Sequence, residues 1–396
     1  MIDRLTLHNY KAFQHAEIPL GPLTLLTGLN SSGKSSVLQS LALLRQSYES
    51  GDLALSTLTN EEHEAGRRTS VTGRGLLLNG ELVGLGTGED VLHEDFMEDE
   101  PRIGLSVDEG PYHYGWTAAV EREQNLLPLV DADLPDTSEG GRERPTGPAA
   151  VTPAFFTAPF QYLHADRISP AEFYPRDHQV AIGRGFLGVR GEHTVNFLRH
   201  HREDTVPAGP LHHPNAASDD LIVQTAAWMG DLCPGVDIRA DVIKGADVVS
   251  LSYGFRGTAG ATKRRRPSNV GFGLTYVLPI VVACLSARPG TLILLENPEA
   301  HLHPQGQTQM ATLAASAAAQ GAQVIMETHS DHVINGVRLA VKKKLIAPEE
   351  AVFHYFRGDG TGVDFVSPRT DADGMLDQWP SGFFDELENT LDQLIG

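Results

Sequence analysis

The stretch "PLTLLTGLNSSGKSSVLQSLALLRQS", residues 22–47, decides the fold. It begins with an apolar run that ends at Gly28 and closes with leucine residues at helical spacing. Between them, "GLNSSGKS" (28–35) matches G-x-x-x-x-G-K-[ST]. A strand, this loop and a helix in succession let backbone N–H groups and a helix N-terminus surround a polyphosphate. The sequence therefore predicts an α/β fold that binds the phosphates of a nucleotide.

The residues of this loop have separate expected roles. Lys34 would reach the β- and γ-phosphates, and the hydroxyl of Ser35 would ligate Mg²⁺. The glycines would let the backbone curl around the phosphates. The candidate nucleotide-binding residues are Gly28, Asn30, Ser31, Ser32, Gly33, Lys34, Ser35 and Ser36.

Two further apolar runs have the character of buried parallel strands: "TLILLENPEAHLHP" (291–304) and "AQVIMETHS" (322–330). In such sheets ligands bind beyond the carboxyl ends of the strands. We expect Glu296, at the end of the first run, to lie beside the loop and to hold Mg²⁺ through water. We expect His329, at the end of the second, to touch the γ-phosphate or to orient water.

Asn297 follows Glu296 at the position where the P-loop ATPases that this sequence resembles usually carry a second carboxylate. An amide cannot accept the proton of the attacking water, although it can orient that water. Glu299 is the nearest alternative carboxylate, with Pro298 fixing the chain before it. The catalytic candidates are thus Glu296, Asn297, Glu299 and His329, and we expect slow turnover.

A long stretch separates the first strand from the other two, which predicts a large inserted α+β region. The expected organisation is an N-terminal lobe over 1–60, the insertion over 61–260 and a C-terminal lobe over 261–396. Within the insertion we expect irregular chain from 61 to 150, with a mobile loop near 131–150. A helix over 219–233 and strands over 236–243 and 247–255 follow from their patterns.

The chain carries 51 acidic and 31 basic residues, for a formal net charge of −20. This balance opposes general attraction to nucleic acid, so any DNA contact must be local. Two candidate patches are "TKRRRPS" (262–268) and "VKKKL" (341–345). Short charge runs of this kind are also typical of a solvated loop or helix face.

The sequence gives no sign of a membrane segment or a signal peptide, which predicts a cytoplasmic protein. Its two cysteines, Cys233 and Cys284, lie in apolar contexts and are interpreted as core residues. His301 and His303 form an H-x-H pair, but a zinc site would need third and fourth ligands that cannot be assigned.

Together these residues resemble the ABC-type ATPases of the RecF, SMC and OLD group. A bacterial branch of AAA-family ATPases with a short C-terminal domain of unknown function is most similar. The resemblance lies in the opening 40 residues, "LLENPEAHLHP", "RPSNVGFGLTYVLPIVVACLSA" (266–287), "METHSDHVINGVRLAV" (326–341) and "WPSGFFDE" (379–386). It implies a P-loop NTPase head of ABC type, a mixed sheet with a parallel core flanked by helices, together with ATP and Mg²⁺ as cofactors.

The resemblance also implies a homodimer in which each subunit's signature segment caps the ATP held by the other. Here that segment would comprise Ser268, Asn269, Gly271 and Gly273, and it departs from the transporter-like "LSGGQ" because Gly271 stands where a serine is usual. The histidines of the H-x-H pair would then pack at the dimer interface. Arg167, in "YLHADRISP", resembles an arginine of this branch that faces either phosphate or the inserted region.

Three functions remain open at this point. The first is a dimeric, ATP-dependent conformational switch in phage defence or DNA maintenance, acting with a separate effector protein. The second is a nucleotide-bound scaffold with negligible turnover. The third is a RecF-like DNA-repair ATPase.

Overall fold

The computed structural model describes residues 1–53, 57–59, 69–71, 75–96, 99–135, 152–257, 260–358, 362–379 and 393–394. Two compact units make up the chain, and each contains segments that are far apart in sequence. The first consists of Met1–Leu20, Leu29–Ala158 and Phe356–Phe365, and the second of Gly21–Gly28, Pro159–Tyr355 and Val366–Gly396. The range 61–260 therefore contributes to both units.

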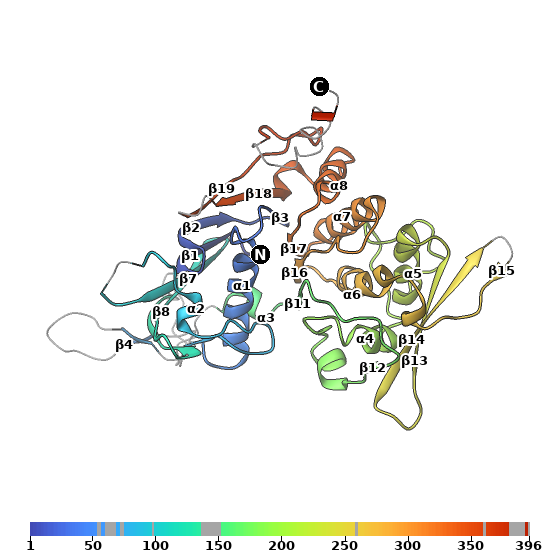
Figure 1. Ribbon diagram of the computed structural model, residues 1–396, viewed down its shortest axis with the longest axis horizontal. Coiled ribbons are helices and arrows are strands. Elements are labelled where there is room, and N and C mark those ends of the chain that lie inside the picture. Colours follow the sequence, from blue (N-terminus) through green and yellow to red (C-terminus); the bar gives the residue numbers. More distant parts are fainter. Residues whose placement is uncertain are drawn as a thin grey trace, which may run out of the picture. The chain divides into compact units, whose positions relative to one another are not determined.

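The second unit is built on five neighbouring strands of a six-stranded sheet, in the order β11-β16-β17-β3-β18 (Figure 1). These strands are β3 (Leu23–Gly28), β11 (Phe160–Leu163), β16 (Leu292–Glu296), β17 (Gln323–Glu327) and β18 (Ala351–Gly358). β11, β16, β17 and β3 pair in parallel. The residues of these four strands are almost all buried. This is typical of a parallel sheet, whose two faces are both covered by helices. The predicted parallel core is confirmed.

Three long helices accompany this sheet: α6 (Phe272–Ser286), α7 (Pro304–Ala319) and α8 (Asp331–Lys342). α6 is apolar all round and buried from Leu274 to Leu285, and it carries Pro279 in its interior. α7 connects β16 to β17 and is the predicted Ala-rich helix. α8 follows β17 and begins at Ser330, whose hydroxyl accepts a hydrogen bond from the N–H of Val333. β16, α7 and β17 thus form a β-α-β unit.

The outer part of the second unit contains α4 (Thr194–His200), α5 (Leu221–Leu232) and a sheet of the order β12-β14-β13. Its strands are β12 (Tyr174–Pro175), β13 (Val236–Val242) and β14 (Val248–Gly257), with the short β15 (Gly260–Ala261) paired to β14. β13 and β14 form an antiparallel hairpin. The predicted helix and the two predicted strands of this region are confirmed. Short turns of helix lie at Gln179–Gly183, Pro267–Asn269 and Pro348–Glu350.

The first unit is built on an antiparallel sheet with the strand order β10-β8-β7-β1-β2. The strands are β1 (Arg4–Tyr10), β2 (Phe13–Pro19), β7 (Arg102–Glu109), β8 (Tyr112–Ala119) and β10 (Leu129–Asp133). Shorter elements are β4 (Thr57–Thr59), β5 (Thr69–Val71), β6 (Leu76–Leu77), β9 (Leu126–Leu127), β19 (Val363–Val366), α2 (Gly88–Val91) and α3 (Ala154–Thr157).

The expectation of irregular chain from 61 to 150 is wrong for much of its described part. Ile103, Leu105 and Val107 alternate along β7 and are at most 1% exposed. A tight turn at Gly110, with φ of 57°, then returns the chain into β8. The predicted mobile loop near 131–150 begins within β10, and residues 136–151 lie outside the described part of the chain.

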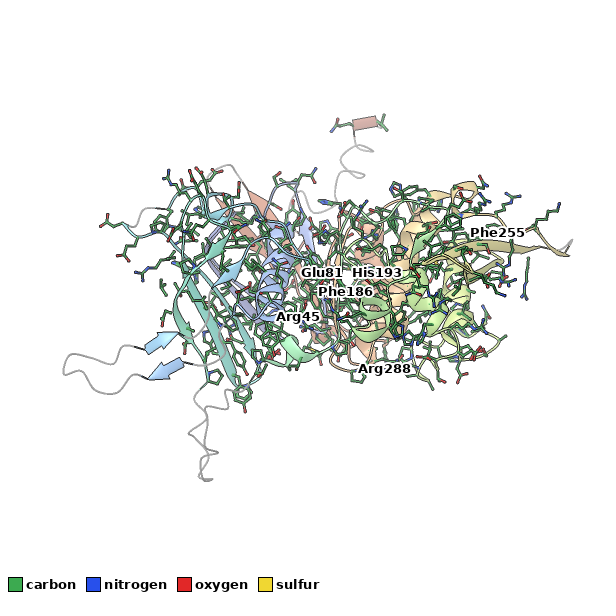
Figure 2. The ribbon with its side chains drawn as sticks, turned by 90° about the horizontal axis from the view of Figure 1, so that it is seen from below. Arg45, Glu81, Phe186, His193, Phe255 and Arg288 are labelled. Atoms are coloured by element: carbon green, nitrogen blue, oxygen red, sulfur yellow. The ribbon has the colours of Figure 1, made fainter. Side chains whose placement is uncertain are left out.

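The helix predicted after the phosphate loop is α1 (Lys34–Glu49), in the first unit. Its Arg45, labelled in Figure 2, pairs with Glu49 at 2.6 Å and donates a hydrogen bond to the carbonyl of Ala158 at 3.0 Å. One turn further on, the ring of Tyr48 stacks on Phe156 with ring centres 4.5 Å apart. These contacts fix α1 against the short helix α3.

Candidate functional site

The phosphate loop follows β3 directly and leads into α1. Its backbone takes positive φ values at Gly28 (130°), Ser31 (60°) and Gly33 (85°). Such values favour glycine, so the two motif glycines stand where the curl of the loop requires them. Leu29, Asn30 and Ser31 are exposed. The outer surface of the loop is thus open, as a phosphate cradle needs.

Gly33 shows why this position admits no side chain. A Cβ there would lie 2.7 Å from Cζ of Phe13 and 3.2 Å from Cβ of Ala12. Gly33 also precedes the first residue of α1 and accepts a hydrogen bond from the N–H of Ser36 at 3.0 Å. Gly33 can therefore lie close to Phe13 and Ala12, and α1 begins directly after it. The N-terminus of this helix is a suitable binding position for a polyphosphate.

Lys34 folds back over the loop. Its Nζ donates to the carbonyl of Leu29 at 2.5 Å and lies 3.4 Å from Oγ of Ser32, which itself donates to the same carbonyl at 2.7 Å. Only 2% of Lys34 is exposed. The ammonium group is therefore held at the centre of the loop, where a phosphate oxygen would compete with the Leu29 carbonyl.

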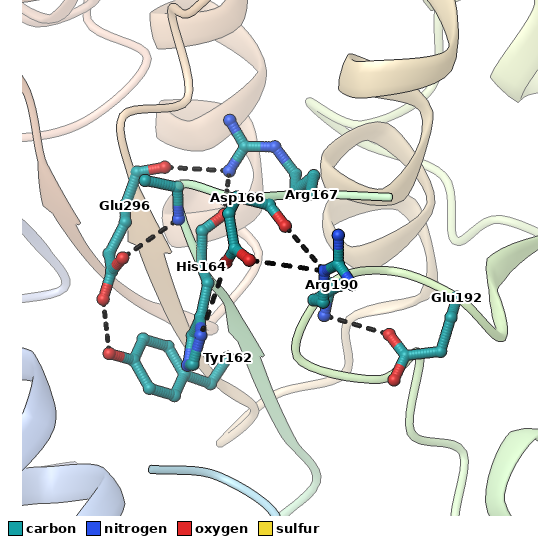
Figure 3. A network of polar contacts seen from close by, with 8 residues as sticks. Tyr162, His164, Asp166, Arg167, Arg190, Glu192 and Glu296 are labelled. Carbon is teal, nitrogen blue, oxygen red and sulfur yellow. Dashed lines mark hydrogen bonds and ion pairs between the residues drawn. The ribbon is translucent and has the colours of Figure 1, made fainter. Parts of the chain in front are cut away.

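In the second unit, Glu296 ends β16 with both carboxylate oxygens engaged (Figure 3). Oε1 accepts a hydrogen bond from the hydroxyl of Tyr162 at 2.5 Å, and Oε2 accepts one from the N–H of Ala165 at 2.9 Å. Both donors come from β11 and the turn after it. Each carboxylate oxygen has a second lone pair, so this orientation still allows water or Mg²⁺ to bind.

The strand of Glu296 and the strand that leads into the phosphate loop are not adjacent in the sheet. β17 lies between β16 and β3, and Glu327 pairs in register with Glu296 on one side and with Leu26 on the other. Glu327 is only 6% exposed. The strand of His329 does adjoin that of Glu296, as predicted. The carboxyl end of the sheet thus carries a second acid that the sequence analysis did not single out.

Asn297 has a left-handed backbone conformation, with φ of 44°. Asparagine adopts this region more readily than most side chains. Its N–H donates to the carbonyl of Glu327 at 2.9 Å. Within the described part of the chain, its Oδ1 is buried and accepts no hydrogen bond. A buried acceptor of this kind fits a bound water or a metal-bound water.

Glu299 and His329 are linked. Oε1 of Glu299 accepts a hydrogen bond from the N–H of His329 at 2.7 Å, and Glu299 is 9% exposed. Burial raises the pKa of Glu299, while the His329 amide, the Thr328 hydroxyl and the charge of Arg167 oppose that shift. The ring of His329 is 38% exposed and its Nε2 lies 3.9 Å from Glu327. Glu299 is therefore directed toward the backbone of the next strand.

The predicted signature segment lies at the start of α6. Ser268, Asn269 and Gly271 are exposed, and a Cβ added at Gly271 would meet nothing within 4 Å. At Gly273, in contrast, a Cβ would lie 2.7 Å from the carbonyl of His301. One glycine therefore leaves the surface open, while the other lets α6 pack closely on the turn after Glu296.

A cavity of about 470 Å³ adjoins this segment. Asn269, Gly271 and Gly273 line it together with the turn 301–303. Cys233 and Arg265 also reach it. Cys284, by contrast, is fully buried in the core, as predicted, and burial raises its pKa to about 12.

The two histidines of the H-x-H pair serve different contacts. The ring of His301 lies edge-on to Phe272 and Tyr276, with ring centres 4.7 and 4.9 Å away. Nδ1 of His303 accepts the N–H of Gln305 and so caps α7. Among the described residues, no group of three or more His, Cys, Asp or Glu side chains could hold a metal ion.

The basic patches differ in how far they are neutralised. Arg264 pairs with Asp237, and Arg266 pairs with Glu172 at 2.6 Å. Lys342, Lys343 and Lys344 are exposed at the end of α8. The lysines of the second patch are thus exposed, while two arginines of the first are engaged in ion pairs.

The strand order and the loop define a P-loop ATPase with the fold of an SMC head. The chain is similar to the solved "SmcHead bound to the C-winged helix domain of ScpA" at 13% identity, covering 93% of this chain and 98% of that chain with a TM-score of 0.51. An SMC head derived from Pyrococcus furiosus matches at 12% identity over 100% and 99% of the two chains, with a TM-score of 0.48. One from Thermotoga maritima matches at 10% identity over 92% and 98%, with a TM-score of 0.41. The first of these matches, at 13% identity, establishes the fold alone.

The chain belongs to the family described as "AAA domain, putative AbiEii toxin, Type IV TA system", whose model matches residues 23–335. Residues 346–394 match the model "Protein of unknown function (DUF3696)". Both agree with the resemblance to AAA-family ATPases with a short C-terminal domain. No curated protein matches the chain. Within the described residues, none of the helices has the length and apolar character needed to cross a membrane.

The sequence analysis missed two side chains around this site, Tyr162 and Glu327, and it named Arg167 without predicting the backbone carbonyls that Arg167 binds. A signal for the first was present, because "FQYLHA" (160–165) is an apolar run ending in a polar turn, like the other three strands. Glu327 ends its run as Glu296 ends the preceding one. The contacts of Arg167 with the carbonyls of Glu296 and Asn297 gave no signal in the sequence, because these acceptors are distant along the chain.

Proposed function

We propose that this protein binds and slowly hydrolyses Mg²⁺-ATP, and that ATP drives a homodimer to close as a conformational switch. The conformation of the phosphate loop carries the proposal. Its glycines allow the curl, Gly33 leaves no room for a side chain, and Lys34 holds its charge at the centre. Family membership supports the same conclusion.

Mg²⁺ fits the residues available for it. The hydroxyl of Ser35 and the carboxylate of Glu296 are oxygen ligands of the type that Mg²⁺ prefers, the second acting through water. When bound, Mg²⁺ neutralises charge that develops on the phosphates. Tyr162 and Ala165 keep the Glu296 carboxylate in one orientation, which supports its assignment to the metal.

Slow turnover follows from the residue at 297. General-base help typically contributes ~10² to 10⁴ in rate, and an amide cannot supply it. The buried Oδ1 of Asn297 can still orient the attacking water. His329, on the neighbouring strand, is the second candidate for this task.

Dimer closure would bring the signature segment of one subunit to the ATP of the other. The open surface at Gly271 and the 15-residue helix α6 behind it suit an approach to the γ-phosphate. The SmcHead of the solved complex is bound to a separate protein. We likewise propose a separate effector for this chain, in phage defence or DNA maintenance in the cytoplasm. DNA, if it is a partner, would contact local basic patches such as Lys342 to Lys344.

The specific alternative is a nucleotide-bound scaffold with negligible turnover. Asn297 also favours the scaffold, because this position then lacks the usual carboxylate. Glu299 favours it as well, since its carboxylate already accepts a hydrogen bond from the backbone of His329. Steady-state phosphate release from the purified protein distinguishes the two functions. Release that depends on Mg²⁺ and is lost in Glu296→Gln supports the switch, whereas tight ATP binding without release supports the scaffold.

A further inference from the structure

Arg167 is a buried cation whose guanidinium group is bonded to backbone carbonyls (Figure 3). Its Nη1 donates to the carbonyl of Glu296 at 2.8 Å and to that of His164 at 2.8 Å. Its Nη2 donates to the carbonyl of Asn297 at 2.7 Å. The two planar nitrogens therefore hold two consecutive peptide units, those of the residues proposed to bind the metal and to orient water.

Burying this charge is costly, which indicates that its position matters. Arg167 is 2% exposed, and burial lowers its pKa to about 10, so it stays charged at neutral pH. The nearby carboxylates of Glu299, Glu296 and Asp166 offset part of that cost. Its Nε is nevertheless buried without a hydrogen-bond partner among the described residues. An apolar side chain would fill this position at a lower cost in free energy if packing were its only role.

The other face of the guanidinium group lies against α6. Its Cζ is 4.1 Å from the ring centre of Tyr276, a cation–π contact. Tyr276 and Phe272, at the start of the same helix, both contact the ring of His301. Gly273 lets the helix approach the backbone of His301. The start of α6 thus packs on His301, in the turn after β16. Arg167 adds a second link, because it contacts Tyr276 of α6 and also the carbonyls of Glu296 and Asn297.

We propose that Arg167 is a positioning residue for ATP hydrolysis, which fixes the backbone of Glu296 and Asn297 and couples it to the signature end of α6. This inference rests on the proposed function. Arg167 does not contact the nucleotide in this role. It sets where the carboxylate of Glu296 and the amide of Asn297 stand, and it lets a movement of α6 on dimer closure reach both.

Arg167→Lys tests the role of the planar group. Lysine keeps the charge but offers a single nitrogen, which cannot hold two peptide units in the same geometry or stack on the ring. A misplacement of about 1 Å can cost ~10²-fold in rate, so we expect kcat to fall by roughly 10- to 100-fold with KM unchanged. Amide hydrogen exchange over residues 296–303 should become faster. Tyr276→Leu, which removes the ring and leaves the guanidinium group, should change kcat and exchange in the same direction.

Arg190→Lys is the matched control. Arg190 lies near Arg167 (Figure 3), its side chain is 52% exposed, and its guanidinium group bonds to Asp166 on the turn after β11. This variant should match the wild type in kcat, KM and exchange. The proposal is overturned if Arg167→Lys also matches the wild type in kcat, or if kcat falls while the exchange of 296–303 is unchanged. If the wild type itself releases no phosphate, the proposed hydrolysis fails first and this role falls with it.

Discussion

The carboxylate of Glu299 accepts a hydrogen bond from the backbone N–H of His329 at 2.7 Å. This bond ties the turn after β16 to the end of β17, between the two strands that carry Glu296 and Glu327. It also occupies the side chain that the sequence offered as an alternative base. Glu299 therefore has a structural partner, whatever further part it plays in hydrolysis.

Glu299→Gln should change how stability depends on pH. Burial raises the pKa of Glu299 above its ordinary 4.5, so between these two pKa values the folded chain keeps a proton that the unfolded chain has lost. The folded state then binds more protons, and the free energy of unfolding falls as pH rises through this window. The glutamine variant lacks this loss, so its stability relative to the wild type should increase as pH rises from 4.5 toward neutrality. Urea unfolding at several pH values measures the difference, and a difference independent of pH would contradict it.

Lys34→Ala should abolish ATP binding while leaving the protein folded. The substitution removes the cation at the centre of the loop and the bond to the carbonyl of Leu29. Losing one such hydrogen bond costs about 1 kcal/mol of stability, so unfolding should change little. Calorimetry with ATP and Mg²⁺ makes the measurement, and Lys11→Ala, which removes a hydrogen bond to Gln39 at 2.7 Å, is the control. Equal ATP affinity in Lys34→Ala and the wild type would remove the phosphate-loop assignment.

The parallel core and the loop could be predicted because their signals are local. A buried strand is a continuous apolar run, and the loop needs glycines and a lysine at fixed positions. The order of the strands is not local, which is why the place of β17 between β3 and β16 was not foreseen. The same reason applies to Arg167 and Tyr162, whose partners are set by the pairing of β11 with β16.

The hairpin of β7 and β8 was missed for a different reason. Its alternating pattern is present in "RIGLSVDEG" (102–110), but the surrounding glycines, prolines and charges favoured an irregular interpretation. Antiparallel pairing of β7 with β1 satisfies the backbone hydrogen-bonding groups along one edge of this hairpin, and that pairing stabilises it. Tertiary contacts here outweigh local composition.

Asn297→Glu should raise the single-turnover rate of hydrolysis, because a carboxylate can accept the proton of the attacking water. The gain is bounded by the ~10² to 10⁴ that general-base help supplies. Glutamate tolerates φ of 44° poorly, so the variant should also lose roughly 1–2 kcal/mol of stability. Asn297→Asp offers a carboxylate of the same size as the native amide and tolerates this backbone better.

Glu299→Gln completes that series, and it should lower the rate if Glu299 acts as a base. An unchanged rate in Asn297→Glu, Asn297→Asp and Glu299→Gln together would mean that neither position handles the water. Rapid quench with limiting ATP gives the rates directly.

The central claim, that ATP closes a homodimer, is tested most directly by the light-scattering mass of the 42.8 kDa chain with Mg²⁺, with and without a non-hydrolysed ATP analogue. The account predicts that the analogue, by binding the closed dimer best, raises the wild type from the mass of one chain to that of two, or makes a dimer that is already present more compact. Gly271→Arg should stay at the monomer mass with the analogue bound, because its side chain has room in the folded chain but fills the approach surface. An analogue that binds the wild type without changing either its mass or its compactness would contradict the claim.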